Sequence, residues 1–150
     1  MKKVICALGL AVASVSSALA TTYPLTIENC GYKETFTKAP ERVVALGQNT
    51  VEILLLLGLE DKVKASAFWP TKVLPQLADQ NAKIKTLTVE IPTLESVLAQ
   101  NPDFVPAQSP LLLGPESKVA KRDDLMTLGV NSYVSPGMCA TKKATGDMYG

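Results

Sequence analysis

The sequence predicts an α/β fold in which a parallel sheet is flanked by helices and preceded by an N-terminal β-hairpin. Three observations lead to this class: short apolar runs alternate with helix-like runs, turn residues separate them, and the apolar runs are nearly continuous. Near-continuous apolar strands that alternate with helices are typical of a parallel sheet covered on both faces. We therefore expect one Rossmann-like lobe.

The first twenty residues have the features of a secretory signal peptide. Lys2 and Lys3 form a basic start, residues 4–15 an apolar stretch, and residues 18–20 an A-x-A cleavage site. Cleavage would remove two lysines and leave 13 basic and 14 acidic residues, a net charge of −1. We expect export to a periplasm, and a surface of this charge gives no reason to expect nucleic acid as a partner.

Residues 23–38 are expected to form the hairpin. Apolar and polar residues alternate loosely around Cys30 and Gly31, and Gly31 can supply the backbone conformation of a tight turn. Pro40 then separates the hairpin from the sheet.

The sheet and its helices follow in alternation. The strands are expected at residues 43–46, 63–68, 84–87, 104–107 and 132–134, and the helices at residues 49–57, 71–78, 93–100 and 115–128. Asn49 with Glu52 three residues later has the pattern of a capping box. Pro115 and Glu116 suit the first turn of the last helix, and Gly129 suits its left-handed end.

Residues 118–124 are the only local run of charge. The run contains both signs, and its simplest interpretation is the solvated face of a helix.

Two segments join a strand to a helix with little slack, and together they carry a resemblance. They read APERVVALGQNTVEILLLLGL at residues 39–59 and PTLESVLAQNPDFV at residues 92–105. This pair resembles the N-terminal lobe of ABC-transporter substrate-binding proteins of the ferric-siderophore, haem and cobalamin class. The resemblance covers nearly all of residues 23–139. It implies that residues 21–139 are one lobe of a two-lobed binding protein, and that residues 140–150 begin a linker to a missing second lobe.

Ligand-binding residues are expected where the loops of a parallel sheet converge, at the carboxyl ends of its strands. The candidates are Gln48, Asn49, Trp69, Gln108 and Ser109. Gln48 and Asn49 offer neutral donors and acceptors beside Gly47. The alternative is that Asn49 is only a helix cap and that Gln48 is only an exposed residue. Trp69 is the only tryptophan, and the resemblance implies a cleft lined by aromatic side chains, but packing at the rim is the alternative. Gln108 and Ser109 are polar, as most loop residues are.

Glu95 is a candidate for docking rather than for ligand binding. It falls in P-T-L-E-S, where the resemblance implies a surface carboxylate that docks on arginines of the membrane permease. A carboxylate in the first turn of a helix also stabilises the helix dipole by roughly 0.3–1 kcal/mol. Both roles can hold at once.

Cys30 and Cys139 remain after signal cleavage, in an oxidising compartment. We expect a disulfide between them, which would close a long loop and contribute roughly 4–5 kcal/mol on the chain-entropy model. The alternative is a pair of free buried thiols.

Several kinds of chemistry have no candidate residues in this chain. It contains no histidine, which is the commonest metal ligand and the usual general base. No phosphate-binding glycine motif or nucleophile motif is present. We expect no catalytic residues, no metal site and no cofactor.

The favoured function is that of a monomeric substrate-binding component of an ABC importer. It would capture a metal chelate, first an iron chelate of the ferric-siderophore class and then haem or cobalamin, and dock it to the permease; truncation would impair both steps. One alternative is a non-catalytic exported module in which a single lobe binds or interacts. An exported α/β enzyme is the other alternative, and it comes last.

Overall fold

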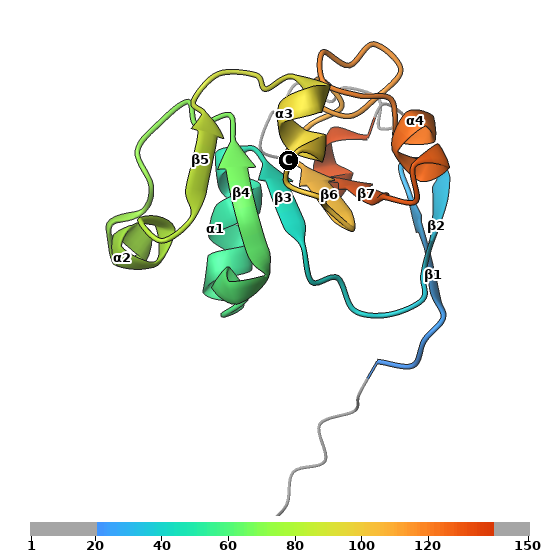
Figure 1. The fold of residues 1–150 in the computed structure, drawn as a ribbon, viewed down its shortest axis with the longest axis horizontal. Helices are drawn as coiled ribbons and strands as arrows, with labels where there is room; N and C mark the ends of the chain where they lie inside the picture. Colours follow the sequence, from blue (N-terminus) through green and yellow to red (C-terminus); the bar gives the residue numbers. More distant parts are fainter. Residues whose placement is uncertain (1–20, 140–150) are drawn as a thin grey trace, which may run out of the picture.

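The computed structural model describes residues 21–139, which form a five-stranded parallel sheet and a two-stranded antiparallel hairpin beside it (Figure 1). The strand order in the sheet is β5-β4-β3-β6-β7, and each strand runs parallel to its neighbours. The predicted fold class is confirmed. The predicted signal peptide and the predicted linker lie outside the described residues.

The hairpin consists of β1 (Leu25–Asn29) and β2 (Tyr32–Phe36). Its two turn residues both have positive φ, 51° at Cys30 and 82° at Gly31, as a type I′ turn requires. Asn29 pairs with Tyr32 across this turn. The predicted hairpin is confirmed, and Cys30 shares the left-handed conformation that the sequence indicated only for Gly31.

Each predicted strand is present, with ends that differ from the prediction by at most one residue. The strands are β3 (Val43–Leu46), β4 (Val63–Ala67), β5 (Lys85–Thr88), β6 (Phe104–Ala107) and β7 (Asn131–Val134). All four residues of the central strand β3 are buried. This burial explains why its sequence is apolar at every position rather than at alternate ones.

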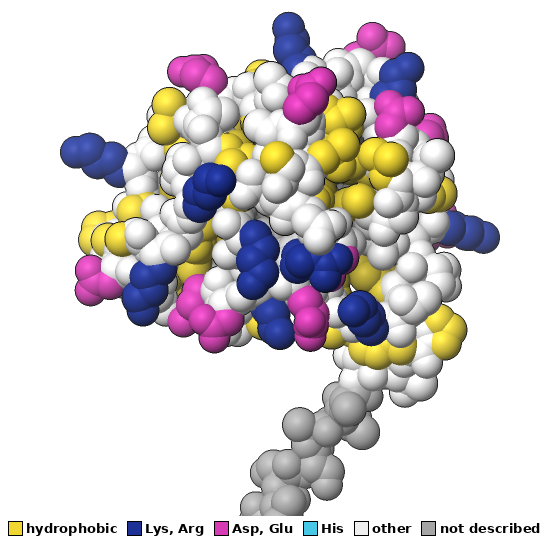
Figure 2. Space-filling view, in the orientation of Figure 1, with side chains coloured by type: hydrophobic (Ala, Val, Ile, Leu, Met, Phe, Trp, Pro, Cys, Tyr) yellow, Lys and Arg dark blue, Asp and Glu magenta, His cyan; other side chains and the backbone are white. Residues whose placement is uncertain are grey.

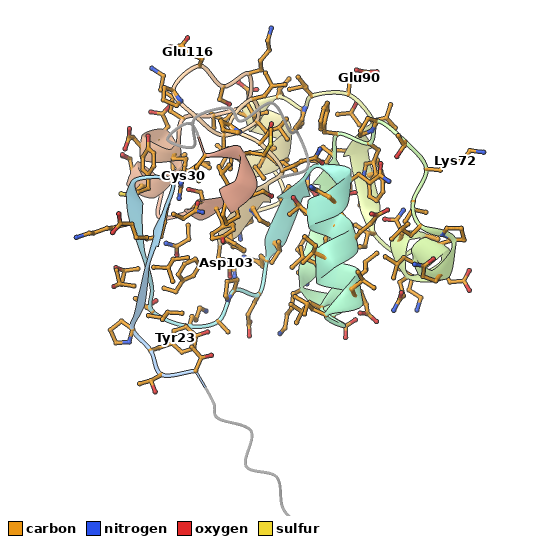
Figure 3. The ribbon with its side chains drawn as sticks, turned by 180° about the vertical axis from the view of Figure 1, so that it is seen from behind. Tyr23, Cys30, Lys72, Glu90, Asp103 and Glu116 are labelled. Carbon is orange, nitrogen blue, oxygen red and sulfur yellow. A yellow bond between two sulfur atoms is a disulfide. The ribbon has the colours of Figure 1, made fainter. Side chains whose placement is uncertain are left out.

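Helices cover both faces of the sheet, as Figures 1 and 3 show from opposite sides. On one face, Val51 and Leu55 of α1 (Gln48–Leu56) pack against Ala45. On the other face, Val97 of α3 (Leu94–Leu98) and Leu125 of α4 (Arg122–Thr127) belong to a second core. Two apolar cores therefore hold the sheet between them.

The predicted helix at residues 71–78 begins too early. The structure has a short 3-10 turn at Pro75–Leu77 followed by α2 (Ala78–Asn81), and two further 3-10 turns at Glu60–Lys62 and Pro136–Met138. Leu74, with ψ of 131°, is extended. A residue before proline is disfavoured in the helical conformation, so Pro75 fixes the start of this element.

The predicted helix at residues 115–128 is wrong in its first half. Pro115 and Glu116 do not open a helix, because α4 begins only at Arg122. The preceding residues form a loop closed by a bridge between Leu113 and Ala120. Gly129 has φ of 72° directly after the helix, so the predicted left-handed end is confirmed.

The predicted capping box at Asn49 is also wrong. The N-cap of α1 is Gly47, without a side-chain cap, and Asn49 lies inside the helix with its side chain exposed. A side-chain cap is found instead on α3, where the hydroxyl of Thr93 accepts a hydrogen bond of 3.2 Å from the amide of Ser96.

The two sequence segments that carried the resemblance are bonded to each other. The carboxylate of Asp103 accepts hydrogen bonds from the amides of Glu41, at 3.1 Å, and Arg42, at 2.8 Å. The side chain of Arg42 donates to the carbonyl of Asn101 at 2.6 Å. These bonds bring the chain into β3 and β6 side by side, which explains why the polar residues before both strands matter for the fold.

A disulfide and a buried polar cluster attach the hairpin to the sheet. Cys30 and Cys139 are bonded, as predicted, and join the hairpin turn to the segment after β7. Arg122, in the charge run predicted to be a solvated helix face, is instead buried beside Glu34 of β2, so that prediction is wrong at this residue. Arg122 Nε also donates to Ser132 Oγ at 2.9 Å.

Candidate functional site

The candidate site is the edge of the sheet where the carboxyl ends of the strands meet. The structure brings all five predicted binding residues there: Gln48 and Asn49 after β3, Trp69 after β4, and Gln108 and Ser109 after β6. Because these three strands are neighbours, their loops lie side by side. Lys72, Glu90 and Glu116 mark this edge in Figure 3, and Asp103 lies toward the opposite edge.

Gly47 and Gln108 are in close contact at the centre of this edge. Gly47 has φ of 107°, and a Cβ at this position would overlap the Cβ of Gln108 and lie 2.7 Å from its Oε1. The amide of Gln108 also donates to the carbonyl of Leu46 at 2.8 Å. Glycine is therefore required here so that the β6 loop can cross the end of β3.

The side-chain oxygen of Gln108 differs from the other polar side-chain atoms at this edge in its burial and hydrogen bonding. It is buried, and it has no hydrogen-bond partner among residues 21–139. Buried polar atoms are nearly always paired, and an unpaired one costs about 1–3 kcal/mol. Gln108 thus holds an unsatisfied acceptor just beneath the surface of this edge.

Phe68 and Trp69 form a strained bend at the end of β4. Phe68 has φ of 66°, a conformation that costs an aromatic residue about 1–3 kcal/mol. Two backbone bonds hold the bend, from Phe68 N to Thr88 O at 3.2 Å and from Trp69 N to Val89 O at 2.9 Å. The bend directs Phe68 to one apolar core and Trp69 to the other.

Trp69 is half-buried and is held by core packing and by a hydrogen bond. Its ring packs against the core beneath α1, and its Nε1 donates to Ser66 Oγ at 3.1 Å. The sequence left rim packing and ligand contact open for Trp69. The structure shows the packing, and Trp69 stays partly accessible to solvent.

The side-chain amide of Gln48 forms hydrogen bonds within the protein. Its Oε1 accepts from Thr71 Oγ1 at 2.7 Å, and its Nε2 donates to the Lys72 carbonyl at 2.8 Å. Asn49 is exposed, and the carbonyl of Ser109 accepts from the amide of Leu112 at 3.1 Å. Direct ligand contacts of these three residues stay predictions.

The sequence did not predict the exposed apolar residues of this edge as part of the candidate site. Four exposed side chains lie on its loops, with exposed fractions from 39% to 58%: Leu74, Val89, Leu111 and Met138. Their position shortly after the predicted strand ends could have indicated them, because exposed apolar residues at such positions are typical of a binding surface.

Charge at this edge is mixed in sign, with one more cation than anion. The loops after β4, β5 and β6 carry three cations and two anions: Lys72, Lys118, Lys121, Glu90 and Glu116. Figure 2 shows side chains of both signs interspersed along the upper rim, with hydrophobic side chains between them. The edge is suited to a ligand with large apolar surface and little net charge.

A shallow hollow in the described part of the chain lies elsewhere. It has a volume of about 360 Å³ and is lined by residues from β2, the end of α4 and the start of β7, among them Lys33, Met126 and Asn131. Because Asn131 begins β7, this hollow is at the amino edge of the sheet. It is not formed by any of the predicted binding residues.

Glu95 is exposed in the first turn of α3. Among residues 21–139 it forms no ion pair. Its carboxylate is therefore free to take either role predicted for it.

Two kinds of feature are absent from residues 21–139. No cluster of three or more histidine, cysteine or acidic side chains gathers there in a way that could hold a metal ion. No helix in this part of the chain has the length and apolar character needed to cross a bilayer.

Comparison with known proteins assigns a class to this geometry. No protein-family model and no curated protein matches the sequence. A periplasmic binding protein from Veillonella parvula is similar to it, with 28% identity over 79% of this chain and 40% of that chain, and a TM-score of 0.66. An ABC-type Fe3+-hydroxamate transport protein from Saccharomonospora viridis has 30% identity over 79% of this chain and 41% of its own, with a TM-score of 0.62.

The catecholate-siderophore binding protein VctP from Vibrio cholerae shares the fold at 23% identity, over 73% of this chain and 36% of that one, with a TM-score of 0.52. The similar structures are thus periplasmic binding proteins of Fe3+-hydroxamate, siderophore and haem transport systems, and the resemblance predicted from the two segments is confirmed. These neighbours are transport proteins and not enzymes. The chain spans about 40% of the length of the first two structures, so its fold corresponds to one lobe of such a protein.

Proposed function

We propose that this chain is the substrate-binding component of an ABC importer, that it acts as a monomer in the periplasm, and that the carboxyl edge of its sheet contacts an iron chelate. One observation carries the proposal: half-buried Trp69 and Gln108, whose side-chain oxygen has no partner among residues 21–139, lie at one edge of a lobe whose solved neighbours are binding proteins. An aromatic surface with few polar atoms is typical of a small-molecule site.

Iron enters this proposal only as a chelate. A chelator that fills the coordination sphere of iron leaves no position for a protein ligand. The lobe then has to recognise the outer surface of the chelate, through apolar contact and hydrogen bonds. The residues at this edge offer both.

The charge of the edge favours one class of chelate. A ferric trihydroxamate is electrically neutral, whereas a ferric tris-catecholate is strongly anionic and calls for clustered cations. Three lysines at this edge, Lys72, Lys118 and Lys121, are opposed by Glu90 and Glu116, so the edge carries only one excess positive charge. Ferric hydroxamates therefore come first in the proposal, and catecholates, haem and cobalamin follow.

Equilibrium dialysis of the mature, oxidised protein against each chelate tests this order. If two lobes contribute equally to a ~1 μM site, one lobe supplies about half of its ~8 kcal/mol, and the Kd of this lobe is near ~1 mM. We expect a ferric trihydroxamate to be retained at this level more than a ferric tris-catecholate. Stronger retention of the catecholate would overturn the assignment of ligand class, and retention of no chelate by folded protein would overturn the function.

Glu95 is proposed as a docking residue for the permease. Its exposure and its lack of an ion pair in the described residues support this role, since docking between charged surfaces must be reversible. The test is growth of the source organism on the chelate as iron source, with Glu95→Lys in the chromosomal gene. We expect loss of uptake with normal protein levels. Asp79→Lys, which reverses an exposed acid in the first turn of α2 (Ala78–Asn81), is the matched charge control. Unchanged uptake in Glu95→Lys would contradict docking.

A further inference from the structure

We propose that Gln48 and Glu52 are positioning residues that hold the 70–74 loop against α1, so that Trp69 is a preformed wall of the ligand-binding surface. The inference deepens the proposed function and rests on it. It assigns to Gln48 a role different from the direct ligand contact that the sequence predicted, and to Glu52 a role in place of the capping box.

Gln48 binds the loop through both ends of its amide. Its Oε1 accepts from Thr71 N at 3.2 Å and from Thr71 Oγ1 at 2.7 Å. Its Nε2 donates to the carbonyl of Lys72 at 2.8 Å. The side chain of Lys72 points away from α1 in Figure 3, so this residue is held through its backbone while its charge stays in solvent.

Glu52 completes the attachment one helical turn further along α1. A single oxygen, Oε1, accepts from Gln48 Nε2 at 3.1 Å and from Leu74 N at 3.0 Å. The carboxylate thus fixes the orientation of the Gln48 amide and binds the far end of the loop. Charged acceptors make stronger hydrogen bonds than neutral ones, which suits a residue that anchors two donors.

The loop needs these partners because it has no regular structure of its own. No strand or helix is assigned between β4 and the 3-10 turn that starts at Pro75. The two side chains satisfy three of its backbone groups, those of Thr71, Lys72 and Leu74. Backbone groups of a loop otherwise bind water, and the loop then samples several conformations.

The attachment fixes Trp69 from the side of α1. On the other side, Trp69 N is bonded to Val89 O at the end of β5. Trp69 and Val73 both pack against the core beneath α1, so holding the loop also holds the apolar contact around the indole. A binding surface that is ordered before the ligand arrives avoids the entropic cost of ordering it on binding.

The first test needs no ligand, because Trp69 is the only tryptophan and reports on its own surroundings. We expect Gln48→Ala and Glu52→Ala to give a red-shifted emission, lower anisotropy and a larger acrylamide quenching constant. Glu52→Gln keeps the accepting oxygen and should restore wild-type values. Gln76→Ala removes an exposed amide from the following 3-10 turn and is the matched control.

The result that would overturn the inference is wild-type anisotropy and quenching in both alanine variants. If Gln48→Ala fails to fold, Thr71→Val, which removes only the hydroxyl donor, carries the same test. An intermediate rise in quenching in Thr71→Val supports the attachment, and no rise contradicts it.

A second arm links the loop to binding and separates the two proposals. With a ferric trihydroxamate as the probe, Glu52→Ala should weaken binding and Glu52→Gln should restore it, since Glu52 acts through the loop. Equal binding by wild type and Glu52→Ala would contradict the positioning role. If wild type binds no chelate, the proposed function fails, and the ligand-free measurements still decide whether Gln48 and Glu52 position Trp69.

Discussion

Glu34 and Arg122 form an ion pair with 3.2 Å between Oε1 and Nη2, and each side chain is only 1% exposed. The two residues are 88 positions apart and join β2 of the hairpin to α4. Asn29 O accepts from Arg122 Nη1 at 2.7 Å, and Ser132 Oγ donates to Glu34 Oε1 at 2.7 Å. A buried ion pair that is fully hydrogen-bonded in this way fixes where the hairpin sits.

Replacing Arg122 alone should destabilise the lobe strongly. We expect Arg122→Ala to lower the free energy of unfolding by about 3–5 kcal/mol, because it leaves the Glu34 carboxylate buried without its partner. Urea unfolding followed by circular dichroism measures this. The double variant Glu34→Gln with Arg122→Met should be more stable than Arg122→Ala, since it buries no unpaired charge.

An exposed pair provides the control. Lys62 lies 3.7 Å from Glu41 at the surface. Lys62→Ala should change the free energy of unfolding by only about 0–1 kcal/mol. A loss in Arg122→Ala no larger than the loss in Lys62→Ala would contradict a structural role for the buried pair.

The disulfide should stabilise the same attachment. We expect Cys30→Ser with Cys139→Ser to lower the free energy of unfolding by about 2–5 kcal/mol. The mature wild-type protein, denatured without reductant, should show no reactive thiol, because both cysteines are bonded. Two reactive thiols per chain would show that the bond does not form.

Gly47 should not tolerate a side chain. Gly47→Ala combines an unfavourable φ of 107° with overlap against Gln108, and we expect a loss of at least about 2 kcal/mol in the free energy of unfolding. Thermal unfolding measures it. Gly137→Ala is the matched control, since a Cβ there meets no atom within 4 Å. Equal stability of the two variants would mean that Gly47 is not constrained by Gln108.

Asp103 should be sensitive to loss of its carboxylate. Asp103→Ala removes the acceptor for the amides of Glu41 and Arg42, and we expect a cost of about 1–3 kcal/mol in the free energy of unfolding. Asp103→Asn keeps one oxygen and should lose less. Hydrogen exchange of the Arg42 amide reports on the bond directly, and unchanged exchange in Asp103→Ala would contradict it.

The sequence predicted what depends on local pattern. The strands were found because buried parallel strands are apolar at every position, as in Val43–Leu46. The hairpin and the end of the last helix were found because Gly31 and Gly129 stand where positive φ is needed. The five candidate residues were placed at one edge because the alternation of elements predicted parallel strands, whose carboxyl ends share one edge; the order of the strands came only from the structure.

What depends on distant contacts was not predicted. Arg122 looked like part of a solvated run because its partner Glu34 is remote in sequence. The start of α4 was placed too early because Pro115 and Glu116 resemble a first turn, while the bridge between Leu113 and Ala120 holds that segment in a loop. The bonds of Gln48 to the 70–74 loop were missed for the same reason, since nothing near Gln48 in sequence indicates Thr71.

The most direct test of the central claim is quenching of Trp69 fluorescence in the mature, oxidised protein by a ferric trihydroxamate. The half-buried ring lies at the edge proposed to meet the chelate, so we expect quenching that saturates with concentration. N-acetyltryptophanamide under the same conditions corrects for absorption by the chelate. Quenching by the folded protein that matches this free compound at every concentration would contradict binding at the carboxyl edge.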